Sequence, residues 1–588
     1  MNMMKNRRYL SILICLVSTL SISAQNVYPP LTDDPQNNYP TNYFRHPINL
    51  PVSLSGDFAE IRPNHFHSGI DLRTGGKEGE KVFSPADGYV SRINISAWGG
   101  GKVLYITHPN GYRTVYMHLS EFCGEIGKFV HDYQYSHHVF SFDIDLPADS
   151  IKVTQGQLVA LTGNTGGSGG PHLHYEIRYA SNDQPINPLY FGIKYSDPIA
   201  PTIENIKIYP ANSRTSINGK NAEYYLIEQP RNVRHDTVTV AGRFYTGIYT
   251  YDHMEAGSGS KNGVEWIELY VDDQLFHRYS VPTFLFEETR AINAIIDYPQ
   301  YRRNRNYYIV TRHLRGDRNT FCTAYRDNGF LQFDDARLHK LEYRVGDYKG
   351  NTTSRVFYVR SKPDALLADN DASLCSIQVS GKPITYFKSF SHFADGFQAY
   401  IEPYTVYEND EIVYSTATKA AYLTPLHYFN LKIHQLPPHK AFTVKLAIPE
   451  SIPENLRSKL TVVCINGNDC SACSSIIEEG MLVATTRSFG AFAIKMDTVA
   501  PSVKPMNFAD GKTITTKNIV IKISDNLTGV VRYDCFINGE WVLAEHDGKT
   551  ATLTASTSTM HKGRNRVTFI LTDATGNTIE KTWTLIKP

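Results

Sequence analysis

The sequence predicts an all-β protein made of several domains, and three observations support this fold class. At 588 residues, the chain is too long to fold around one hydrophobic core. Aromatic residues make up 12% of it, including 38 Tyr and 28 Phe, and these residue types favour strands. Alternating apolar and polar runs recur along the chain, whereas the periodicity of long helices is nearly absent. We therefore expect antiparallel β domains in series, each with its own core.

The first 24 residues have the pattern of a secretory signal peptide. Lys5, Arg7 and Arg8 precede an apolar run from Leu10 to Leu20, and small residues follow up to Ala24. The run is too short to span a membrane, and no other stretch approaches that length. We therefore expect a signal peptide over 1–24, an N-terminal segment over 25–49 and no membrane span. The mature protein is expected in the periplasm, at the cell surface or outside the cell.

The charge balance argues against one class of partner. Lys and Arg number 59 against 58 Asp and Glu, so the formal net charge is only +1. A protein that binds a polyanion through its overall charge is strongly basic, and we expect no nucleic-acid partner. Two basic stretches, Arg302–Arg305 and Arg312–Arg318, could touch an anionic envelope polymer, although a solvated loop is the simpler interpretation.

We interpret residues 50–195 as one antiparallel β domain. Two strand-like runs, Lys102–His108 and Tyr112–Leu119, flank Pro109-Asn110-Gly111, which is a signal for a tight hairpin. Turn dipeptides such as Asp87-Gly88 recur through this part of the chain. Such spacing of short strands and turns is typical of an antiparallel sheet.

Two later segments resemble each other and predict β-sandwiches. One opens with Asp197-Pro198-Ile199-Ala200-Pro201 and the other with Asp497-Thr498-Val499-Ala500-Pro501, and both later carry Asp-x-x-Gly-Asn, at 347–351 and 573–577. This order of signals is typical of a sandwich of about 100 residues. We expect a sandwich-like domain with insertions over 196–362, a further β-rich domain over 363–496, and an immunoglobulin-like sandwich over 497–588.

Three short pieces of the first domain contain the residues best suited to chemistry. His67 and Asp71 are separated by three residues, His118 lies in the second run of the expected hairpin, and His172 and His174 follow a glycine-rich segment. With 21 His in the chain, a single H-x-H pair can arise by chance, so the three pieces must be weighed together.

Strand geometry gives these histidines a common setting, because residues two apart on a strand point to the same face. In the segment from His172 to Arg178, one face is polar and consists of His172, His174, Glu176 and Arg178. The other face is apolar and consists of Leu173, Tyr175 and Ile177. By the same alternation, His118 is expected to share a face with Tyr112, Thr114 and Tyr116. Two histidines on a polar strand face, backed by a core face, would form a rigid platform.

The platform suggests a catalytic zinc site. Such a site uses three protein ligands from His, Asp or Glu and keeps a fourth position open. His67, Asp71 and His174 supply that set. His118 and His172 remain as nearby imidazoles that could take a proton from the attacking water and stabilise the developing oxyanion. Which of the two is the general base is left open.

The joint pattern resembles the lysostaphin/LytM-type metallopeptidase family. That family carries H-x-x-x-D, then a Y-x-H-L-S-like strand, then G-N-T-G-x-S-x-G-P-H-L-H-[FY]-E-[IV]. This chain has His67 and Asp71, Tyr116–Ser120, and the continuous match Gly163–Ile177. The likeness covers roughly residues 50–191.

The resemblance implies one zinc ion on His67, Asp71 and His174, with His118 and His172 catalytic. It also implies an antiparallel β domain with an open groove for an extended peptide, and peptide bonds of peptidoglycan cross-links or stem peptides as substrate. Two alternatives stay open: a non-catalytic activator of other wall hydrolases, and a peptidase acting on extracytoplasmic proteins. The C-terminal β domains could bind an envelope protein.

Three local points stay open. His65 could replace His67 as a ligand, although the H-x-x-x-D spacing selects His67. Glu176 could act as a base, although an orienting role is favoured. The stretch over about 122–152 is longer than the family's usual connection and contains three histidines. The simpler interpretation is a surface loop or an extra hairpin. The more specific interpretation is a flap that borders the groove.

Overall fold

The computed structural model describes residues 39–588 except 229–232, 235, 255–258, 325 and 369–380. The predicted signal peptide over 1–24 and most of the segment over 25–49 lie outside the described residues. Strands dominate the described part of the chain, so the all-β prediction is confirmed. No helix in this part is both long and apolar enough to cross a membrane.

Residues 39–195, here called the N-terminal unit, are built on a nine-stranded antiparallel sheet. Its main path is β1 (Leu54–Gly56), β4 (Ile70–Arg73), β13 (His172–Tyr179), β8 (Tyr112–Met117), β7 (Lys102–Thr107), β6 (Gly88–Ile95) and β10 (Phe142–Asp145). Strand β11 (Lys152–Val153) adds to β6 and β14 (Pro185–Ile186) to β13. A small second sheet contains β5 (Lys81–Phe83), β12 (Leu158–Leu161) and β9 (Glu121–Phe122).

Two local predictions for this sheet are confirmed. Strands β7 and β8 form the expected antiparallel hairpin around residues 109–111. Leu173, Tyr175 and Ile177 on β13 are completely or almost completely buried in the core of the unit. The expected polar face of β13 is largely buried as well, since Arg178 is covered by the rings of Tyr105 and Phe286.

The segment over 122–152 does not form the expected loop or hairpin. It contains helix α1 (Gly124–His137), followed by β10 at the edge of the sheet. The helix buries Ile126, Val130 and Gln134, and this spacing of four residues places all three on one helical face. His131 and His137 lie on its exposed side, in agreement with the simpler interpretation of solvated histidines.

The remaining chain forms three sandwiches. The first sandwich (196–362) has a four-stranded and a seven-stranded sheet: β17 (Tyr224–Tyr225), β15 (Thr202–Pro210), β21 (Phe244–Tyr251) and β24 (Ile309–Val310); and β16 (Ser216–Ile217), β20 (Thr237–Ala241), β27 (Thr352–Ser361), β26 (Leu338–Gly346), β22 (Trp266–Val271), β23 (Gln274–Ser280) and β25 (Cys322–Ala324). Two short helices, α2 (Ile292–Ile295) and α3 (Tyr298–Asn304), follow β23. Residues of both sheets share one core.

The middle sandwich (382–496) has a six-stranded and a five-stranded sheet: β28 (Lys382–Ile384), β31 (Asp410–Ala417), β32 (Leu426–Leu431), β38 (Gly490–Met496), β34 (Leu460–Asn466) and β35 (Asp469–Cys473); and β29 (Phe390–Ala394), β30 (Phe397–Ile401), β33 (Phe442–Ala447), β37 (Met481–Thr486) and β36 (Ser475–Glu478). The C-terminal sandwich (497–588) has two four-stranded sheets: β39 (Ser502–Pro505), β40 (Asn518–Ser524), β44 (Thr552–Ser556) and β43 (Ala544–Asp547); and β42 (Glu540–Trp541), β41 (Val530–Ile537), β45 (Gly563–Asp573) and β46 (Thr578–Lys587).

A hairpin of the N-terminal unit buries its apolar side chains in the core of the first sandwich. It consists of β2 (Ile61–Arg62) and β3 (His65–Phe66) and immediately precedes His67. Phe58, Ile61 and Phe66 belong to the same hydrophobic cluster as the strands of the first sandwich. Phe66 is only 2% exposed and makes an edge contact with Phe321, with ring centroids 4.8 Å apart. The two units therefore share a core.

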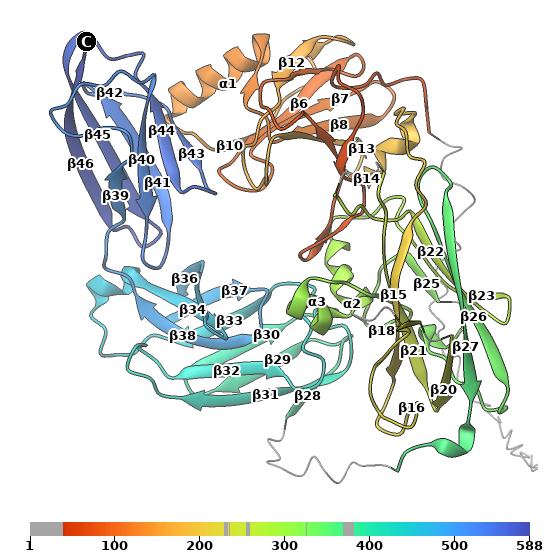
Figure 1. Ribbon diagram of the computed structural model, residues 1–588. Coiled ribbons are helices and arrows are strands. Elements are labelled where there is room, and N and C mark those ends of the chain that lie inside the picture. The colour runs from red at the N-terminus through yellow and green to blue at the C-terminus, as the bar shows by residue number, and fades with distance from the viewer. Residues whose placement is uncertain (1–38, 229–232, 235, 255–258, 325, 369–380) are drawn as a thin grey trace, which may run out of the picture.

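The four units follow one another around a ring, and the last contacts the first (Figure 1). Lys102 of β7 forms an ion pair with Glu545 of β43 at 2.9 Å. Just after α1, His138 stacks on Trp541 of the C-terminal sandwich, with centroids 4.9 Å apart and rings 11° from parallel. Lys549 also donates a hydrogen bond to the carbonyl oxygen of Asn164. The inserted helix thus lies against the C-terminal sandwich.

The two basic stretches occupy different settings. Arg302 and Arg303 lie on helix α3 rather than in the expected loop, and both are exposed. In the second stretch, Arg315 pairs with Glu408 at 2.7 Å and Arg318 packs over the ring of Tyr404. The second stretch therefore joins the first and middle sandwiches.

Replacing Phe321 with Ala is expected to lower the free energy of unfolding by about 3–5 kcal/mol, the usual cost of removing a buried phenyl ring. The loss should appear as a lower midpoint in denaturant unfolding followed by intrinsic fluorescence. Phe393→Ala is the matched control, because Phe393 is 63% exposed and should contribute little. Equal midpoints for the two variants would contradict the shared core.

Candidate metal centre

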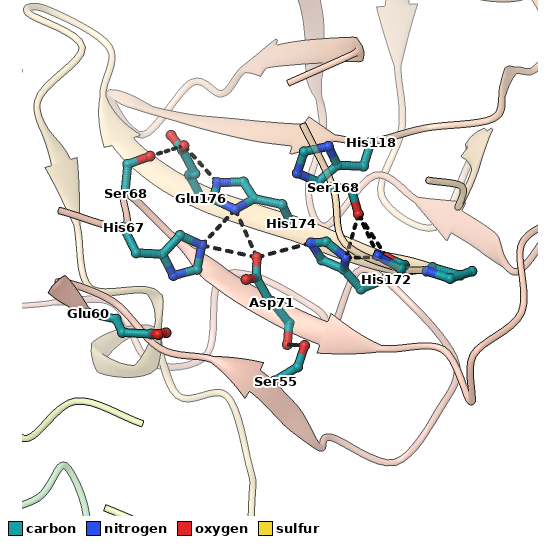
Figure 2. Close-up of polar contacts among 12 residues, drawn as sticks. Ser55, Glu60, His67, Ser68, Asp71, His118, Ser168, His172, His174 and Glu176 are labelled. Atoms are coloured by element: carbon teal, nitrogen blue, oxygen red, sulfur yellow. Dashed lines mark hydrogen bonds and ion pairs between the residues drawn. The ribbon is translucent and has the colours of Figure 1, made fainter. Parts of the chain in front are cut away.

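Three donor atoms converge on the polar side of the N-terminal sheet (Figure 2). His67 Nε2 lies 3.0 Å from Asp71 Oδ1 and 2.8 Å from His174 Nδ1, and His174 Nδ1 lies 3.0 Å from Asp71 Oδ1. Asp71 on β4 and His174 on β13 are direct partners in the antiparallel register. His67 follows β3, so a third segment completes the group. All three residues are at most 4% exposed.

The second nitrogen of each imidazole is held, which fixes the tautomers. His67 Nδ1 lies 2.6 Å from the carbonyl oxygen of Asp57 and must donate a hydrogen to it. His174 Nε2 lies 2.9 Å from Glu176 Oε1 and donates to that carboxylate. In the neutral rings, His67 Nε2 and His174 Nδ1 therefore carry the lone pairs that point toward Asp71.

The charges of the cluster are set by burial and by its two carboxylates. Burial lowers the pKa of His67 to about 4, despite the opposing charge of Asp71. Burial also disfavours the charged form of His174, but hydrogen bonds to Asp71 and Glu176 outweigh it and raise its pKa to about 9. Burial works against ionised Asp71 too, yet the histidines around it hold its pKa well below the usual range. Without a metal, one proton therefore stays on His174 at neutral pH.

This donor set fits a zinc ion. Two imidazole nitrogens and one carboxylate oxygen are ligands that zinc favours, at about 2.0–2.2 Å each. Ligands at that distance around one tetrahedral ion lie roughly 3.3 Å from each other, only slightly farther apart than these three atoms. The cluster would therefore need little rearrangement to hold one ion, and Asp71 also borders the cavity described below.

Neighbouring charges orient both carboxylates. Arg62 donates from Nη2 to Asp71 Oδ2 at 2.7 Å, so the oxygen outside the cluster is held as well. Glu176 accepts hydrogen bonds from Ser68 Oγ at 2.6 Å and from Arg178 Nε. Sequence reasoning assigned no role to Arg62 or Ser68, although both lie within five residues of His67. The contacts of Glu176 agree with the orienting role favoured for it.

Glycine at position 69 is required by the close approach of β13. A Cβ atom there would lie 2.4 Å from the carbonyl oxygen of Tyr175 and 3.0 Å from His174 Nε2. Any side chain would therefore push His67 and Asp71 away from His174. This accounts for the Gly in the H-S-G-x-D segment.

His118 and His172 lie beside the cluster. Their ring centroids are 4.9 Å apart, and His118 is 6.0 Å from the ring of His174. His118 Nδ1 donates to the carbonyl oxygen of Thr165 at 2.8 Å, and His172 Nδ1 to that of Gly170 at 2.8 Å. His172 Nε2 lies 3.3 Å from Asp71 Oδ1. The structure thus brings all five predicted residues together.

The predicted strand face of His118 is wrong. Thr114 and Tyr116 are completely buried, and the ring of Tyr116 lies in the core of the unit. His118 follows the end of β8 with a left-handed backbone (φ +64°), which breaks the alternation of the strand. The ring consequently points to the same side as His172 and His174. Backbone strain of this kind is concentrated at functional sites.

A cavity of about 510 Å³ opens beside the cluster. It is bordered by Asp71, His118 and His172 and by glycine-containing segments: Thr74–Gly76 and Gly167–Pro171. Among the described residues, none from 122–152 lines it, so the structure gives no support to the flap hypothesis. His65 does not line it either: its ring is exposed and contacts the carbonyl oxygen of Pro63.

Comparison with known proteins identifies two segments. Residues 65–188 match Peptidase family M23, and residues 382–497 match a Zu5-like domain. An "Uncharacterized metalloprotease" of Haemophilus influenzae is 34% identical over 156 residues, or 25% of this chain and 26% of that protein. "DD-carboxypeptidase/endopeptidase Mpg" of Neisseria meningitidis is 31% identical over 150 residues, or 26% of this chain and 25% of that protein. The likeness to a lysostaphin/LytM-type domain is confirmed for this segment.

A third relative is "Peptidoglycan DD-endopeptidase ShyA" of Vibrio cholerae, 28% identical over 155 residues, or 25% of this chain and 30% of that protein. The chain thus matches between a quarter and a third of the length of these relatives. Among solved structures, the catalytic domain of the M23 protein EnpA from Enterococcus faecalis is 26% identical and covers 26% of this chain and 97% of its own, with a TM-score of 0.19.

Replacing Glu176 with Gln is expected to weaken zinc binding 10–100-fold, the usual effect of losing a carboxylate that orients a ligand histidine. The dissociation constant can be measured by competition with a chromogenic chelator. Glu125→Gln on the exposed side of α1 is the control for a neutralised carboxylate. An unchanged zinc affinity in Glu176→Gln would show that Glu176 does not support His174.

Zinc binding at pH 7 is expected to release about one proton per chain. The raised pKa of His174, about 9, means that its proton is present at pH 7 and must leave before Nδ1 can bind a metal. His67, with a pKa of about 4, is already neutral and contributes none. Calorimetric titrations in buffers of different ionisation enthalpy give this number. Zinc affinity should accordingly rise with pH up to about 9, and release of no proton would contradict the assignment.

Proposed function

We propose that the N-terminal unit is a zinc-dependent endopeptidase that cleaves peptide bonds in peptidoglycan cross-links or stem peptides. The observation that supports this most is the convergence of His67, Asp71 and His174 at an open cavity, with two further imidazoles beside them. The match of residues 65–188 to a peptidase family supports the reaction class. The substrate class rests on relatives named as endopeptidases, one of them as acting on peptidoglycan.

In this proposal, His67 Nε2, Asp71 Oδ1 and His174 Nδ1 hold the single zinc ion. When bound, zinc polarises a carbonyl group and lowers the pKa of a coordinated water. The contacts to Asp57 and Glu176 turn the two imidazoles so that His67 Nε2 and His174 Nδ1 face the ion, and His174 gives up its extra proton when zinc binds. Arg62 holds the outer oxygen of Asp71, so that the carboxylate presents Oδ1 to the ion.

His118 is the better-placed proton acceptor. Burial, together with the positive charges that His174 and His172 can carry, lowers the pKa of His118 to about 3, so this ring stays neutral near pH 7. Its Nδ1 hydrogen is committed to Thr165, which leaves Nε2 with a lone pair. A neutral imidazole beside the cavity can take up a proton during attack by water.

His172 is the better-placed donor. Its Nδ1 hydrogen is committed to Gly170, and its Nε2 lies 3.3 Å from Asp71 Oδ1. In this proposal, the Nε2 side of the ring, which faces the cluster, helps to stabilise the oxygen that gains negative charge in the transition state. The two rings lie side by side, with centroids 4.9 Å apart, so both can reach one substrate group bound at the cluster.

The shape of the cavity suits an extended peptide. Its walls include glycines 75, 76, 167, 169 and 170, whose backbone groups are not screened by side chains. Backbone amides and carbonyls at such walls can pair with the backbone of a substrate strand. Peptidoglycan stem peptides are short and unfolded, so they can enter the cavity without local unfolding.

The remaining features of the proposal concern the whole protein. Residues 1–24 have the pattern of a signal peptide, which supports export to the periplasm or cell surface. The sandwiches offer surfaces for an envelope protein partner.

A non-catalytic activator is the competing function. Against it, all five site residues are present and close together, as hydrolysis requires.

Hydrolysis should be observed when the mature protein is incubated with purified peptidoglycan and the soluble fragments are analysed by mass spectrometry. Activity should be lost with a chelator and restored by zinc. His118→Ala and His172→Ala should each lower the rate about 10²–10⁴-fold while retaining zinc, because they remove proton transfer and not the metal.

His65→Ala is the matched control for His67→Ala, since the two residues are two positions apart in the chain and only His67 reaches the cluster. The first should keep activity and the second should lose both zinc and activity. Intact peptidoglycan after treatment with zinc-loaded protein would favour the activator function. Cleavage of unfolded protein substrates alone would favour a protein peptidase.

A further inference from the structure

Three buried aspartates outside the metal centre meet at one end of the first sandwich. Asp197 precedes β15, Asp252 follows β21 and Asp347 follows β26, so three separate segments each contribute one carboxylate. One oxygen of each lies within 4.8 Å of the other two. Asp197 is 8% exposed, and Asp252 and Asp347 are each 1% exposed.

Asp197 and Asp252 contact each other through their carboxyl groups, and each has an oxygen that no donor group of another residue reaches. Asp197 Oδ2 and Asp252 Oδ1 are buried and accept no hydrogen bond from any residue that the structure describes. Asp347, in contrast, accepts hydrogen bonds on both oxygens: from the backbone amides of Lys349 and Asn351 on Oδ1 and from the side-chain amide of Asn351 on Oδ2. Unpaired buried carboxylate oxygens are costly, and native structures rarely keep them without a ligand.

Neighbouring side chains offset this concentration of charge only in part. The ammonium group of Lys349 opposes it, but its Nζ lies over the ring of Tyr195, 4.0 Å from the centroid. Burial and the charge of Asp347 raise the pKa of Asp197 to about 6. Burial and the charge of Asp197 raise that of Asp252 to about 7. The group is therefore electrostatically incomplete at neutral pH.

We propose that Asp197, Asp252 and Asp347 bind a calcium ion. A donor set made only of oxygen selects a hard cation, and Ca²⁺ accepts irregular arrangements of about six to eight oxygens at 2.3–2.6 Å. Mg²⁺ demands a nearly ideal octahedron and gives up its water reluctantly. Three carboxylates fixed by separate strands, with water completing the shell, suit calcium better.

The C-terminal sandwich contains the same arrangement in a weaker form. Asp497, Asp525 and Asp573 occupy the equivalent positions before β39, after β40 and at the end of β45. There, Asp497 Oδ2 accepts hydrogen bonds from the backbone and the hydroxyl of Thr528, and Asp525 is partly exposed. The internal repeat therefore includes the aspartates, but only the first copy leaves two buried oxygens unpaired on separate residues.

The site lies where the N-terminal unit joins the first sandwich. Asp252 exchanges two backbone hydrogen bonds with Asn262, and the next residue, Gly263, donates to Asp57 Oδ1. The carbonyl oxygen of the same Asp57 holds His67. A calcium ion at this junction would fix the segment that supports one zinc ligand.

Calcium binding can be tested on the zinc-loaded mature chain by equilibrium dialysis. The comparison is between Asp525→Asn, which weakens the second copy, and the double variant with Asp252→Asn added. We expect one more calcium ion per chain in the single variant than in the double variant, with a dissociation constant of about 10⁻⁴–10⁻³ M, as in extracellular calcium modules. Excess Mg²⁺ should not displace it.

Thermal unfolding supplies a second readout. Calcium should raise the melting temperature of Asp525→Asn and leave that of the double variant unchanged. Without calcium, the double variant should melt higher, because it has lost one buried negative charge. Near-UV circular dichroism and zinc content show whether the double variant folds; if it does not, Asp197→Asn replaces Asp252→Asn. Equal calcium binding by single and double variants, or tighter binding of Mg²⁺ than of Ca²⁺, would overturn the proposal.

Discussion

Without a metal, the side chains of the cluster belong to a row of charges that alternate in sign across the N-terminal sheet. In order, the row consists of Arg178, Glu176, His174, Asp71 and Arg62. The guanidinium of Arg178 and the proton on His174 keep the pKa of Glu176 at about 2, although burial works in the opposite direction. The three inner members, Glu176, His174 and Asp71, are thus each paired on both sides. Removing one member would leave its neighbours unpaired in a low-dielectric setting, where such a loss is severe.

This row holds two of the three proposed ligands, Asp71 and His174. The third ligand, His67, is held by a different part of the protein. His67 follows the β2–β3 hairpin, whose apolar residues are buried in the first sandwich. Its Nδ1 is held by Asp57, whose side chain is in turn bonded to Gly263 of that sandwich. The first sandwich is therefore no simple spacer: it completes the setting of His67. A fragment ending near residue 195 would expose this hairpin and lose its packing.

Much of the site was predictable from the sequence because it depends on strand periodicity and local spacing. The alternation along β13 placed His172 and His174 on one face, and the H-x-x-x-D spacing separated His67 from His65. His118 shows where such reasoning ends, since its left-handed backbone reverses the face predicted for it. Contacts made over long sequence distances, such as Phe66 with Phe321, leave no local pattern. Helix α1 did carry a signal, the spacing of Ile126, Val130 and Gln134, but it is short and ends in a polar residue.

The ring of units places the C-terminal sandwich close to the proposed catalytic groove. Lys549 contacts the carbonyl oxygen of Asn164, and the nearby Gly166 and Gly101 approach so closely that neither could carry a side chain. Gly167 and the residues after it form one wall of the cavity, so the docked sandwich supports the base of that wall. His138, just after helix α1, adds to the same contact by stacking on Trp541. The inserted segment therefore takes part in closing the ring, and none of its described residues borders the cavity at the metal centre.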